Sequence, residues 1–218
     1  MPTKRPLVLI DTFLKDETYP LVPEIITKIT GITQSTLDEF GCSPKETLEV
    51  LEAFCAKHKP DYLVAHSGAN FDLPFLYAEL TRNKVDAPCL RSLPLIDTKT
   101  DIPFADEPDS RKLKHLALDI GMINLFPHRA VTDVLTMLLV LSHYDIHQVI
   151  SYQKIPFVLL RAKVSFDQKD LAKARRFAWE RLGEKVVPKC WIKLVKENVV
   201  QHEIDECKKA GFEAVVIA

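Results

Sequence analysis

The sequence predicts an α/β fold in which short buried strands alternate with helices. Three observations lead to this prediction. Short apolar runs rich in Val, Ile and Leu recur with turn residues behind them, helical stretches with recognisable ends lie between these runs, and 47% of the 218 residues are hydrophobic, enough for a sizeable core. Strands that alternate with helices favour a layered, at least partly parallel sheet.

Three apolar runs are expected to form strands whose carboxyl ends carry polar groups. Residues 6–10 end at Asp11, residues 62–66 end at a turn of small residues, and residues 93–96 end at Asp97. In parallel sheets, ligands bind outside the carboxyl ends of the strands. The sequence therefore delivers acidic side chains to the edge where a site is expected.

Four helices are predicted between and after these strands, over residues 43–59, 71–80, 112–120 and 130–141. The first starts with Ser43 as the capping residue, Pro44 at the first helical position and Glu46 closing a capping box, and it stops before Pro60. Gly121 follows the third helix in the position where a left-handed residue ends many helices.

A second, smaller α/β unit is expected after residue 150. It consists of a connector at 154–156, a helix over 170–179, a strand over 190–195, a helix over 199–209 and a strand over 213–217. We therefore assign residues 1–150 to one domain and residues 160–218 to a small basic module. A unit of this size is marginal for folding alone, so we expect it to pack on the first.

The formal net charge of −1 is unevenly distributed along the chain. Residues 161–199 contain 11 Lys/Arg and 5 Asp/Glu, whereas residues 1–160 contain 16 and 21. A basic segment beside an acidic one is compatible with a grip on a phosphate backbone next to a metal-loaded carboxylate site. The alternative is an ordinary solvated helix face.

Other protein classes are disfavoured by the apolar runs and the cysteines. None of the runs is long enough to span a bilayer, and the run after the basic N-terminus is too short for a signal peptide, so we expect a cytoplasmic protein. The five cysteines are scattered and form no Cys-x-x-Cys pair. We therefore expect free thiols.

Three acidic residues stand where an element presents them: Asp11 at a strand end, Asp72 at a helix start and Asp133 in the first turns of an apolar helix. Singly, each is compatible with a structural role, such as a salt bridge between Asp133 and Arg129 or exposure on the outer helix face. Together, three converging carboxylates favour Mg²⁺ or Mn²⁺. Two such ions, about 4 Å apart, can hold both the attacking and the leaving oxygens of a phosphodiester.

His128 lies in the expected loop that enters the last of these helices, five residues before Asp133. An imidazole in this place can accept a proton from an attacking water near neutral pH. The alternative is a helix cap or an ordinary surface residue.

Three segments resemble the motifs of the DEDDh-type 3′–5′ exonucleases, a family that includes polymerase proofreading subunits. They are residues 8–12 (VLIDT), 63–72 (LVAHSGANFD) and 128–133 (HRAVTD), and residues 23–33 also look like a segment of this family. The resemblance covers about residues 7–145. It implies a ribonuclease H-like mixed sheet flanked by helices, with the small C-terminal α/β module behind it.

By position, the resemblance implies that Asp11, Asp72 and Asp133 hold two Mg²⁺ or Mn²⁺ ions and that His128 is the general base. It implies a nucleic acid with a free 3′ end as the substrate, with single-stranded DNA as the first candidate, a replication or repair protein as a partner, and no membrane. No motif in the sequence distinguishes DNA from RNA. The basic module would help to hold the strand.

A second resemblance concerns the C-terminal module. Residues 165–195, with Ala172, Phe177, Trp179 and Trp191, are similar to a small tryptophan-containing module found after some bacterial exonuclease domains. We interpret these aromatic residues first as core and second as a surface on which bases stack.

The sequence departs from the family pattern after Asp11. The family motif is Asp-x-Glu, but Phe13 stands in the place of the Glu, and Phe cannot bind a metal ion. At this place the family has about thirty residues, which form two antiparallel strands. Here only residues 13–22 occur, a segment too short to form two strands and the turn between them. Either this meander is lost, or the natural chain has more residues between Thr12 and Phe13, which predicts a break there.

These departures keep two functional hypotheses open. The first is a 3′–5′ exonuclease with weakened binding of the ion that activates the water. The alternative is a catalytically inactive nucleic-acid-binding or protein-interaction module that keeps the exonuclease fold. A metal-free ligand-binding domain is disfavoured because the chain has 6 Gly and no glycine-rich phosphate loop.

Overall fold

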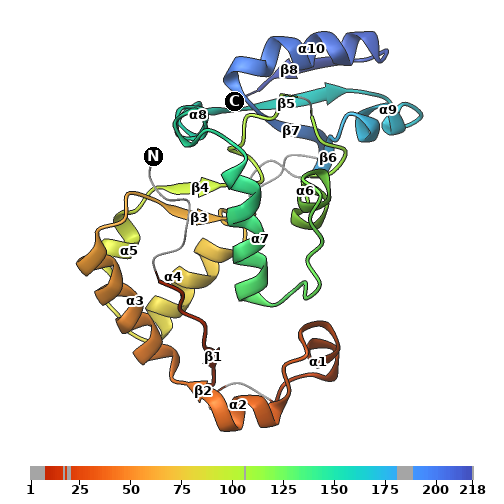
Figure 1. Ribbon diagram of the computed structural model, residues 1–218. Helices are drawn as coiled ribbons and strands as arrows, with labels where there is room; N and C mark the ends of the chain where they lie inside the picture. Colours follow the sequence, from red (N-terminus) through yellow and green to blue (C-terminus); the bar gives the residue numbers. More distant parts are fainter. Residues whose placement is uncertain (1–7, 17, 19–20, 106, 181–188, 218) are drawn as a thin grey trace. The chain divides into compact units, whose positions relative to one another are not determined.

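The structure is a computed structural model that describes residues 8–16, 18, 21–105, 107–180 and 189–217. The chain divides into two compact units, residues 1–153 (unit 1) and residues 154–218 (unit 2). Figure 1 shows the elements of both units along the chain, and each unit is described by itself below.

Unit 1 is built mainly of helices, with two short pairs of parallel strands. Its elements, in chain order, are β1 (Phe13–Leu14), α1 (Glu24–Thr30), α2 (Gln34–Phe40), β2 (Gly41–Cys42), α3 (Pro44–His58), β3 (Leu63–Ala65), α4 (Asp72–Arg82), α5 (Pro88–Ser92), β4 (Leu95–Asp97), α6 (Leu113–Asp119), α7 (Ala130–Ser142) and α8 (Ile146–Gln153).

The second and third predicted strands are confirmed as β3 and β4. They pair in parallel, with Leu63 opposite Leu95 and Ala65 opposite Asp97, so their carboxyl ends meet at one edge. The four predicted helices are confirmed as α3, α4, α6 and α7, whereas α1, α2, α5 and α8 were not predicted. Gly121 adopts the expected left-handed conformation behind α6, with φ of 76°.

The core of unit 1 lies in two clusters between helices. In the first, Leu48 and Cys55 of α3 pack against Leu80 of α4 and Leu90 of α5. The second joins α6 and α7 through buried residues that come from separate segments, namely Ile102, Leu116 and Val140. No single helix among the described residues is long and apolar enough to cross a membrane, although the bent pair of α7 and α8 meets the length and composition criteria jointly.

The first predicted strand, over residues 6–10, is wrong for residues 8–10, and residues 6 and 7 lie outside the described residues. Residues 8–12 are described and form no strand, and Val8, Leu9 and Ile10 are each more than half exposed. Strand β1 starts at Phe13 instead and pairs with Gly41 and Cys42 of β2. A strand needs a hydrogen-bonded neighbour. Only Thr12 separates Asp11 from β1, so the pairing of β1 with β2 sets the direction of the chain at Asp11.

The expected break between Thr12 and Phe13 is also absent from this described segment. The hydroxyl of Thr12 lies 3.4 Å from the carbonyl oxygen of Phe13, and the strand begins directly at Phe13. The described residues between β1 and β2 form α1 and α2 and no strand. The described part of this segment therefore contains no meander, and additional residues between Thr12 and Phe13 in the natural chain stay a prediction.

The short sheets leave part of α7 uncovered. Thr136, Met137 and Val140 are buried, but the opposite side of the helix exposes four large apolar side chains, Val134, Leu135, Leu138 and Leu139. In α/β layers, such a stripe normally packs on a sheet. The exposed stripe on α7 and the exposed Val8–Ile10 segment are two consequences of the same short chain before α1.

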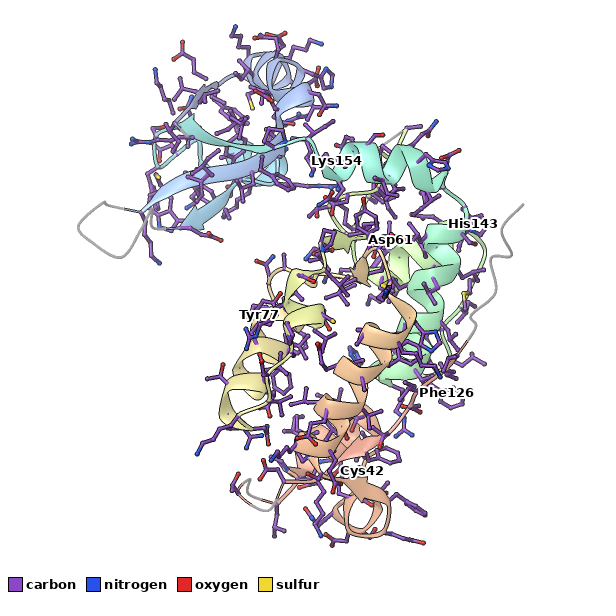
Figure 2. All side chains as sticks on the ribbon, turned by 90° about the vertical axis from the view of Figure 1, so that its left-hand side faces the viewer. Cys42, Asp61, Tyr77, Phe126, His143 and Lys154 are labelled. Atoms are coloured by element: carbon purple, nitrogen blue, oxygen red, sulfur yellow. The ribbon has the colours of Figure 1, made fainter. Side chains whose placement is uncertain are left out.

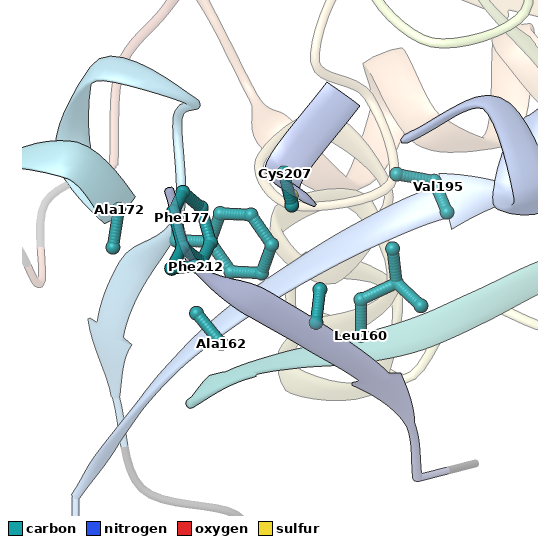
Figure 3. Close-up of a cluster of buried hydrophobic side chains, with 8 residues drawn as sticks. Leu160, Ala162, Ala172, Phe177, Val195, Cys207 and Phe212 are labelled. Atoms are coloured by element: carbon teal, nitrogen blue, oxygen red, sulfur yellow. The ribbon is translucent and has the colours of Figure 1, made fainter. Parts of the chain in front are cut away.

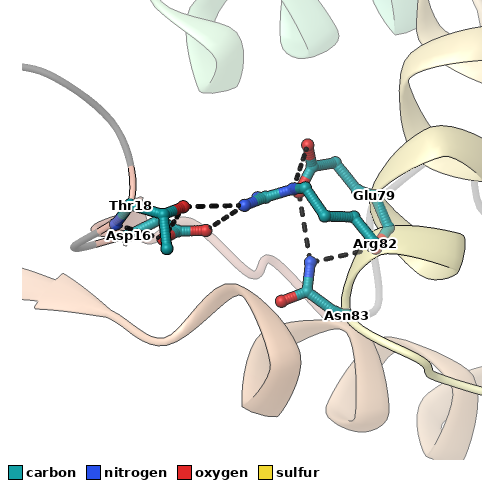
Figure 4. A network of polar contacts seen from close by, with 5 residues as sticks. All are labelled: Asp16, Thr18, Glu79, Arg82 and Asn83. Carbon is teal, nitrogen blue, oxygen red and sulfur yellow. Dashed lines mark hydrogen bonds and ion pairs between the residues drawn. The ribbon is translucent and has the colours of Figure 1, made fainter.

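An arginine ties the segment before α1 to α4 (Figure 4). The guanidinium of Arg82 contacts the carboxylates of Asp16 and Glu79, and the hydroxyl of Thr18 lies 3.3 Å from it. The side chain of Asn83 donates to Glu79 at 3.2 Å. This network links two segments that are 66 residues apart in the sequence.

We expect the pKa of the Asp16 carboxyl to depend more on Thr18 than on Arg82. The hydroxyl and the backbone amide of Thr18 donate to Asp16 at 2.6 and 2.8 Å, and these bonds, followed by Arg82, lower the pKa of Asp16 to about 2. The contribution of this carboxylate to stability is thus present above its unfolded pKa, near 4, and is lost as the pH falls through 2.

The test is an NMR titration of the Asp16 carboxyl. Thr18→Ala should raise its pKa more than Arg82→Ala does, and neither should restore the unfolded value, because one partner remains in each variant. The reverse order of the two variants would contradict this account of the network.

Unit 2 is an antiparallel four-stranded sheet with two helices. Its elements are β5 (Phe157–Lys163), α9 (Lys169–Ala174), β6 (Ala178–Glu180), β7 (Cys190–Lys196), a 3₁₀ turn η1 (Glu197–Val199), α10 (Val200–Lys209) and β8 (Glu213–Val216). The strand order is β6-β7-β5-β8, and all pairs are antiparallel. The described elements thus follow the βαββαβ order of a ferredoxin-like split βαβ motif.

Two sequence predictions for unit 2 need correction. Strand β5 was not predicted, and the helix predicted over 170–179 ends at Ala174. The helix stops because Arg176 adopts a left-handed φ of 63° and Phe177 donates its amide to the carbonyl of Ala172 at 3.0 Å. This is the geometry of a helix end that glycine usually provides, so the sequence carried no signal for it.

The core of unit 2 lies between the sheet and its helices (Figure 3). Leu160 and Ala162 of β5, Val195 of β7 and Cys207 of α10 are buried there. The rings of Phe177 and Phe212 meet edge to face, with their centroids 5.8 Å apart. Unit 2 therefore has a hydrophobic core of its own.

Candidate active site

A buried carboxylate organises the edge where β3 and β4 end. Asp97, the last residue of β4, is 4% exposed. Its Oδ1 atom accepts the backbone amides of Ser67 at 2.8 Å and Lys99 at 3.0 Å, and its Oδ2 atom accepts the amide of Ala69 at 3.3 Å. The amide of Asp97 in turn donates to Asp101 Oδ2 at 2.8 Å.

These bonds fix the turn that leads from β3 into α4. Ser67 adopts a left-handed φ of 68° within the turn, and a Cβ atom at Gly68 would lie 2.4 Å from the Cβ of Ala65, so only glycine fits there. His66 Nδ1 lies 3.0 Å from the hydroxyl of Thr98, which follows Asp97. The turn delivers Asp72 as the first residue of α4.

The electrostatics of this edge favour a cation beside Asp72. Partial burial, together with the negative charge of Asp97, raises the pKa of the Asp72 carboxyl above its usual range, and His66 only partly offsets this. Burial likewise lowers the pKa of His66, so its imidazole contributes little positive charge at neutral pH. The carboxylates of Asp72 and Asp97 are oxygen ligands of the kind that Mg²⁺ or Mn²⁺ prefers, and Lys99 Nζ lies 3.3 Å from Ser67 Oγ in the same turn.

The loop before α7 is organised around Asp133. Asn124 Nδ2 donates to Asp133 Oδ1 at 2.9 Å, and the backbone amide of His128 donates to Asp133 Oδ2 at 3.1 Å. The hydroxyl of Thr132 donates to the carbonyl of Arg129 at 2.8 Å. Phe126 stands in the same loop (Figure 2) and is exposed.

His128 is exposed and left-handed, with φ of 67°. Its backbone amide binds Asp133, whereas its imidazole is presented to solvent. A residue held in this conformation directly beside an acidic residue is typical of functional loops. The loop thus brings His128 and Asp133 together, as the third motif requires.

Arg129 connects this loop to the segment that carries Asp11. Its guanidinium lies 5.6 Å from the centre of the Phe13 ring, and its Nη1 atom donates to the carbonyl of Thr30 at 3.2 Å. The alternative of a salt bridge between Arg129 and Asp133 is therefore not what the structure shows. Asp11 lies two residues before Phe13 and is exposed.

The structure brings the predicted site residues together in part. His128 meets Asp133, and Asp72 lies within electrostatic reach of His66 and Asp97. Within the described part of the chain, however, no group of three or more His, Cys, Asp or Glu side chains is arranged to hold a metal ion. The convergence of Asp11, Asp72 and Asp133 on one pair of ions remains a prediction.

Two residues of the site were missed by sequence reasoning. Asp97 carried a usable signal, because it ends a strand parallel to β3 and such ends share one edge. Asn124 carried none, since its bond to Asp133, nine positions along the chain, depends on how the loop between α6 and α7 closes. The five cysteines are free thiols, as expected.

Comparison with known proteins supports the same interpretation. The sequence model of the exonuclease family described as RNase T matches residues 5–141. A search among curated proteins finds no match. A solved structure described as "The structure of exonuclease I suggests how processivity is achieved" is similar in fold, with a TM-score of 0.55 and 12% sequence identity.

That alignment covers 87% of this chain and 57% of the other, so this chain spans little more than half of the solved protein's length. At this identity the likeness concerns the fold alone. It confirms the predicted ribonuclease H-like α/β class.

Proposed function

The chain belongs to the exonuclease family of DEDDh type, and from this membership we propose that it hydrolyses phosphodiester bonds stepwise from a 3′ end. Nucleic acid is the substrate that the family suggests, and single-stranded DNA is the form that we propose. Asp11, Asp72 and Asp133 would hold two Mg²⁺ or Mn²⁺ ions, and His128 would act as the general base.

The observation that best supports this proposal is the pairing of His128 with Asp133. The backbone amide of His128 lies 3.1 Å from the Asp133 carboxylate, and the His128 residue is exposed to solvent. The ring can then accept a proton from a water and pass it to bulk solvent. Bound divalent ions would supply charge stabilisation at the attacked phosphate.

The residues fit such ions in kind, because the edge offers the carboxylate oxygens of Asp72 and Asp97. Burial and the charge of Asp97 raise the pKa of Asp72, and a bound dication would favour its ionised form. Asp133 is already oriented by Asn124, so its oxygens are held in place. The positions of Asp72 and Asp133 at the starts of two helices add favourable dipoles for bound phosphate oxygens.

The test compares oligonucleotides of one sequence labelled at the 3′ or the 5′ end. Mg²⁺- or Mn²⁺-dependent release of labelled mononucleotide from the 3′-labelled strand first, with a shrinking ladder from the 5′-labelled strand, supports the proposal. Release from the 5′ end first would overturn the direction. An RNA strand of the same sequence shows which sugar is preferred.

We expect Phe13→Glu to lower the metal concentration that half-maximal turnover requires. The substitution adds the carboxylate that the first family motif has and this chain lacks, and each added carboxylate favours a dication. Metal titration of turnover in the parent and the variant is the measurement. Phe13→Gln is the matched control, because it has the same shape without the charge.

The same position favours the second candidate function, a catalytically inactive module that binds nucleic acid or a protein. Phe13 packs on Arg129 rather than offering a ligand, and the site lacks one carboxylate of its family. Strand binding without release at any metal concentration, and no rescue by Phe13→Glu, would support this alternative.

A further inference from the structure

We propose that Trp179 in unit 2 is a stacking platform for the bases of single-stranded nucleic acid. This inference goes beyond the hydrolytic site, because it assigns a binding surface to a unit with its own sheet and core. The surface consists of Trp179 on β6, Trp191 on β7 and the cations around them, and we call it the tryptophan edge.

Trp179 is half exposed although the unit does not need it for its core. Phe177, Val195 and Cys207 fill the interior, and Trp191 packs partly against them. Trp179 lies outside this cluster with 50% of its surface exposed, directly opposite Trp191 in the β6–β7 pair. The first interpretation from the sequence, in which all four residues are core, therefore holds for Ala172 and Phe177 but not for Trp179.

The two indole rings form a preorganised surface. Their centroids are 5.3 Å apart and their planes are tilted by 50°, so Trp191 contacts Trp179 from one side while half of the Trp179 surface stays exposed to solvent. A braced aromatic ring loses little side-chain entropy when a base stacks on it. Every base has a π face, so such stacking tolerates any sequence, as a stepwise exonuclease requires.

The charge around the tryptophan edge suits a polyanion. Lys193 lies two residues beyond Trp191 on the same face of β7, and Arg175 lies four residues before Trp179. Both cations share the carboxylate of Glu203, at 2.8 and 2.9 Å, and Arg175 also lies 3.6 Å from Glu206, so the excess positive charge here rests on the composition of the segment rather than on these pairs. Across residues 161–199, 11 Lys/Arg face 5 Asp/Glu.

This combination favours a nucleic acid strand over an apolar protein surface. An exposed tryptophan alone fits either partner, but a basic surround attracts phosphates through counterion release and repels basic protein surfaces. The opposite face of the sheet exposes the aliphatic residue Leu194, and the ring of Phe157, on this same face, has Lys196 Nζ 4.1 Å from its centre.

The chain itself provides the reporter for the test, because it contains 2 Trp and both lie in the tryptophan edge. The full chain is titrated with oligodeoxythymidylate of about 12 nucleotides, a length within the range that single modules cover. Chelator is present so that the strand is not hydrolysed. We expect quenching of the tryptophan fluorescence and an affinity that falls steeply with salt.

Three variants separate stacking from general binding. Trp179→Ala should weaken binding of the fluorescently labelled strand by about 10- to 100-fold, the loss expected for one stacked base. Trp179→Phe keeps a ring and should recover most of the affinity. Leu194→Ala removes an exposed apolar side chain of the same strand pair from the opposite face and should bind like the parent.

Several results would overturn the inference. They are a parent whose tryptophan fluorescence is not quenched by the strand, a Trp179→Ala variant that binds the strand as tightly as the parent, or a Leu194→Ala variant that loses as much affinity as Trp179→Ala. A variant that changes oligomeric mass rather than strand affinity would assign the tryptophan edge to a second copy of the chain instead. If mononucleotides are released but the tryptophan fluorescence is not quenched by the strand, only this inference is contradicted. If the fluorescence is quenched but no mononucleotide is released in the metal-dependent assay, only the proposed activity is contradicted.

Discussion

Replacing Asp133 by asparagine is expected to abolish metal-dependent release of mononucleotides. An amide is a poor ligand for a dication compared with a carboxylate, and the loss of one charge weakens an already depleted set. The Asn side chain can still accept one of the two bonds that Asn124 and His128 donate, so the loop before α7 should keep its shape. Turnover is measured over a wide Mn²⁺ range.

The matched control is Asp145→Asn. Asp145 accepts two backbone amides at the start of a helix, from His147 at 2.8 Å and Gln148 at 3.2 Å, but it directly precedes α8 and belongs to no motif. Asp145→Asn should lower helix stability about as much as Asp133→Asn does, but it should leave the release of mononucleotides unchanged. Full activity in the Asp133 variant would leave this carboxylate with only its role in the loop and would remove the third motif from the site.

Replacing His128 is expected to lower kcat by about 10²- to 10⁴-fold, with little change in strand affinity, because a general base acts in the transition state. The choice of variant matters, since His128 has a φ of 67°. Alanine disfavours this conformation, whereas asparagine tolerates it. His128→Asn thus removes the base without distorting the amide that holds Asp133.

Single-turnover rates and strand binding in chelator are measured for both variants. His147→Asn, a change of an exposed histidine in α8, serves as the control and should act like the parent. If His128→Ala is impaired and His128→Asn is not, the residue serves the shape of the loop rather than proton transfer.

The sequence alone predicted what is local in this chain. Short apolar runs predicted the strands β3 and β4, and Gly121 predicted the end of α6. The third motif placed His128 five residues before Asp133, and the loop between them joins the two by a backbone hydrogen bond. In each of these cases, neighbouring residues supply the hydrogen-bond partners or the conformational preference.

What only the tertiary structure decided depends on partners far away in the chain. Residues 8–10 have the composition of a buried strand but remain exposed, because a strand also requires neighbours that composition cannot provide. Asp97 became the organiser of the Asp72 turn through amides about thirty residues away. Trp179 was left outside the core because Phe177 and Trp191 already fill it, and packing of that kind is settled only when all elements are in place.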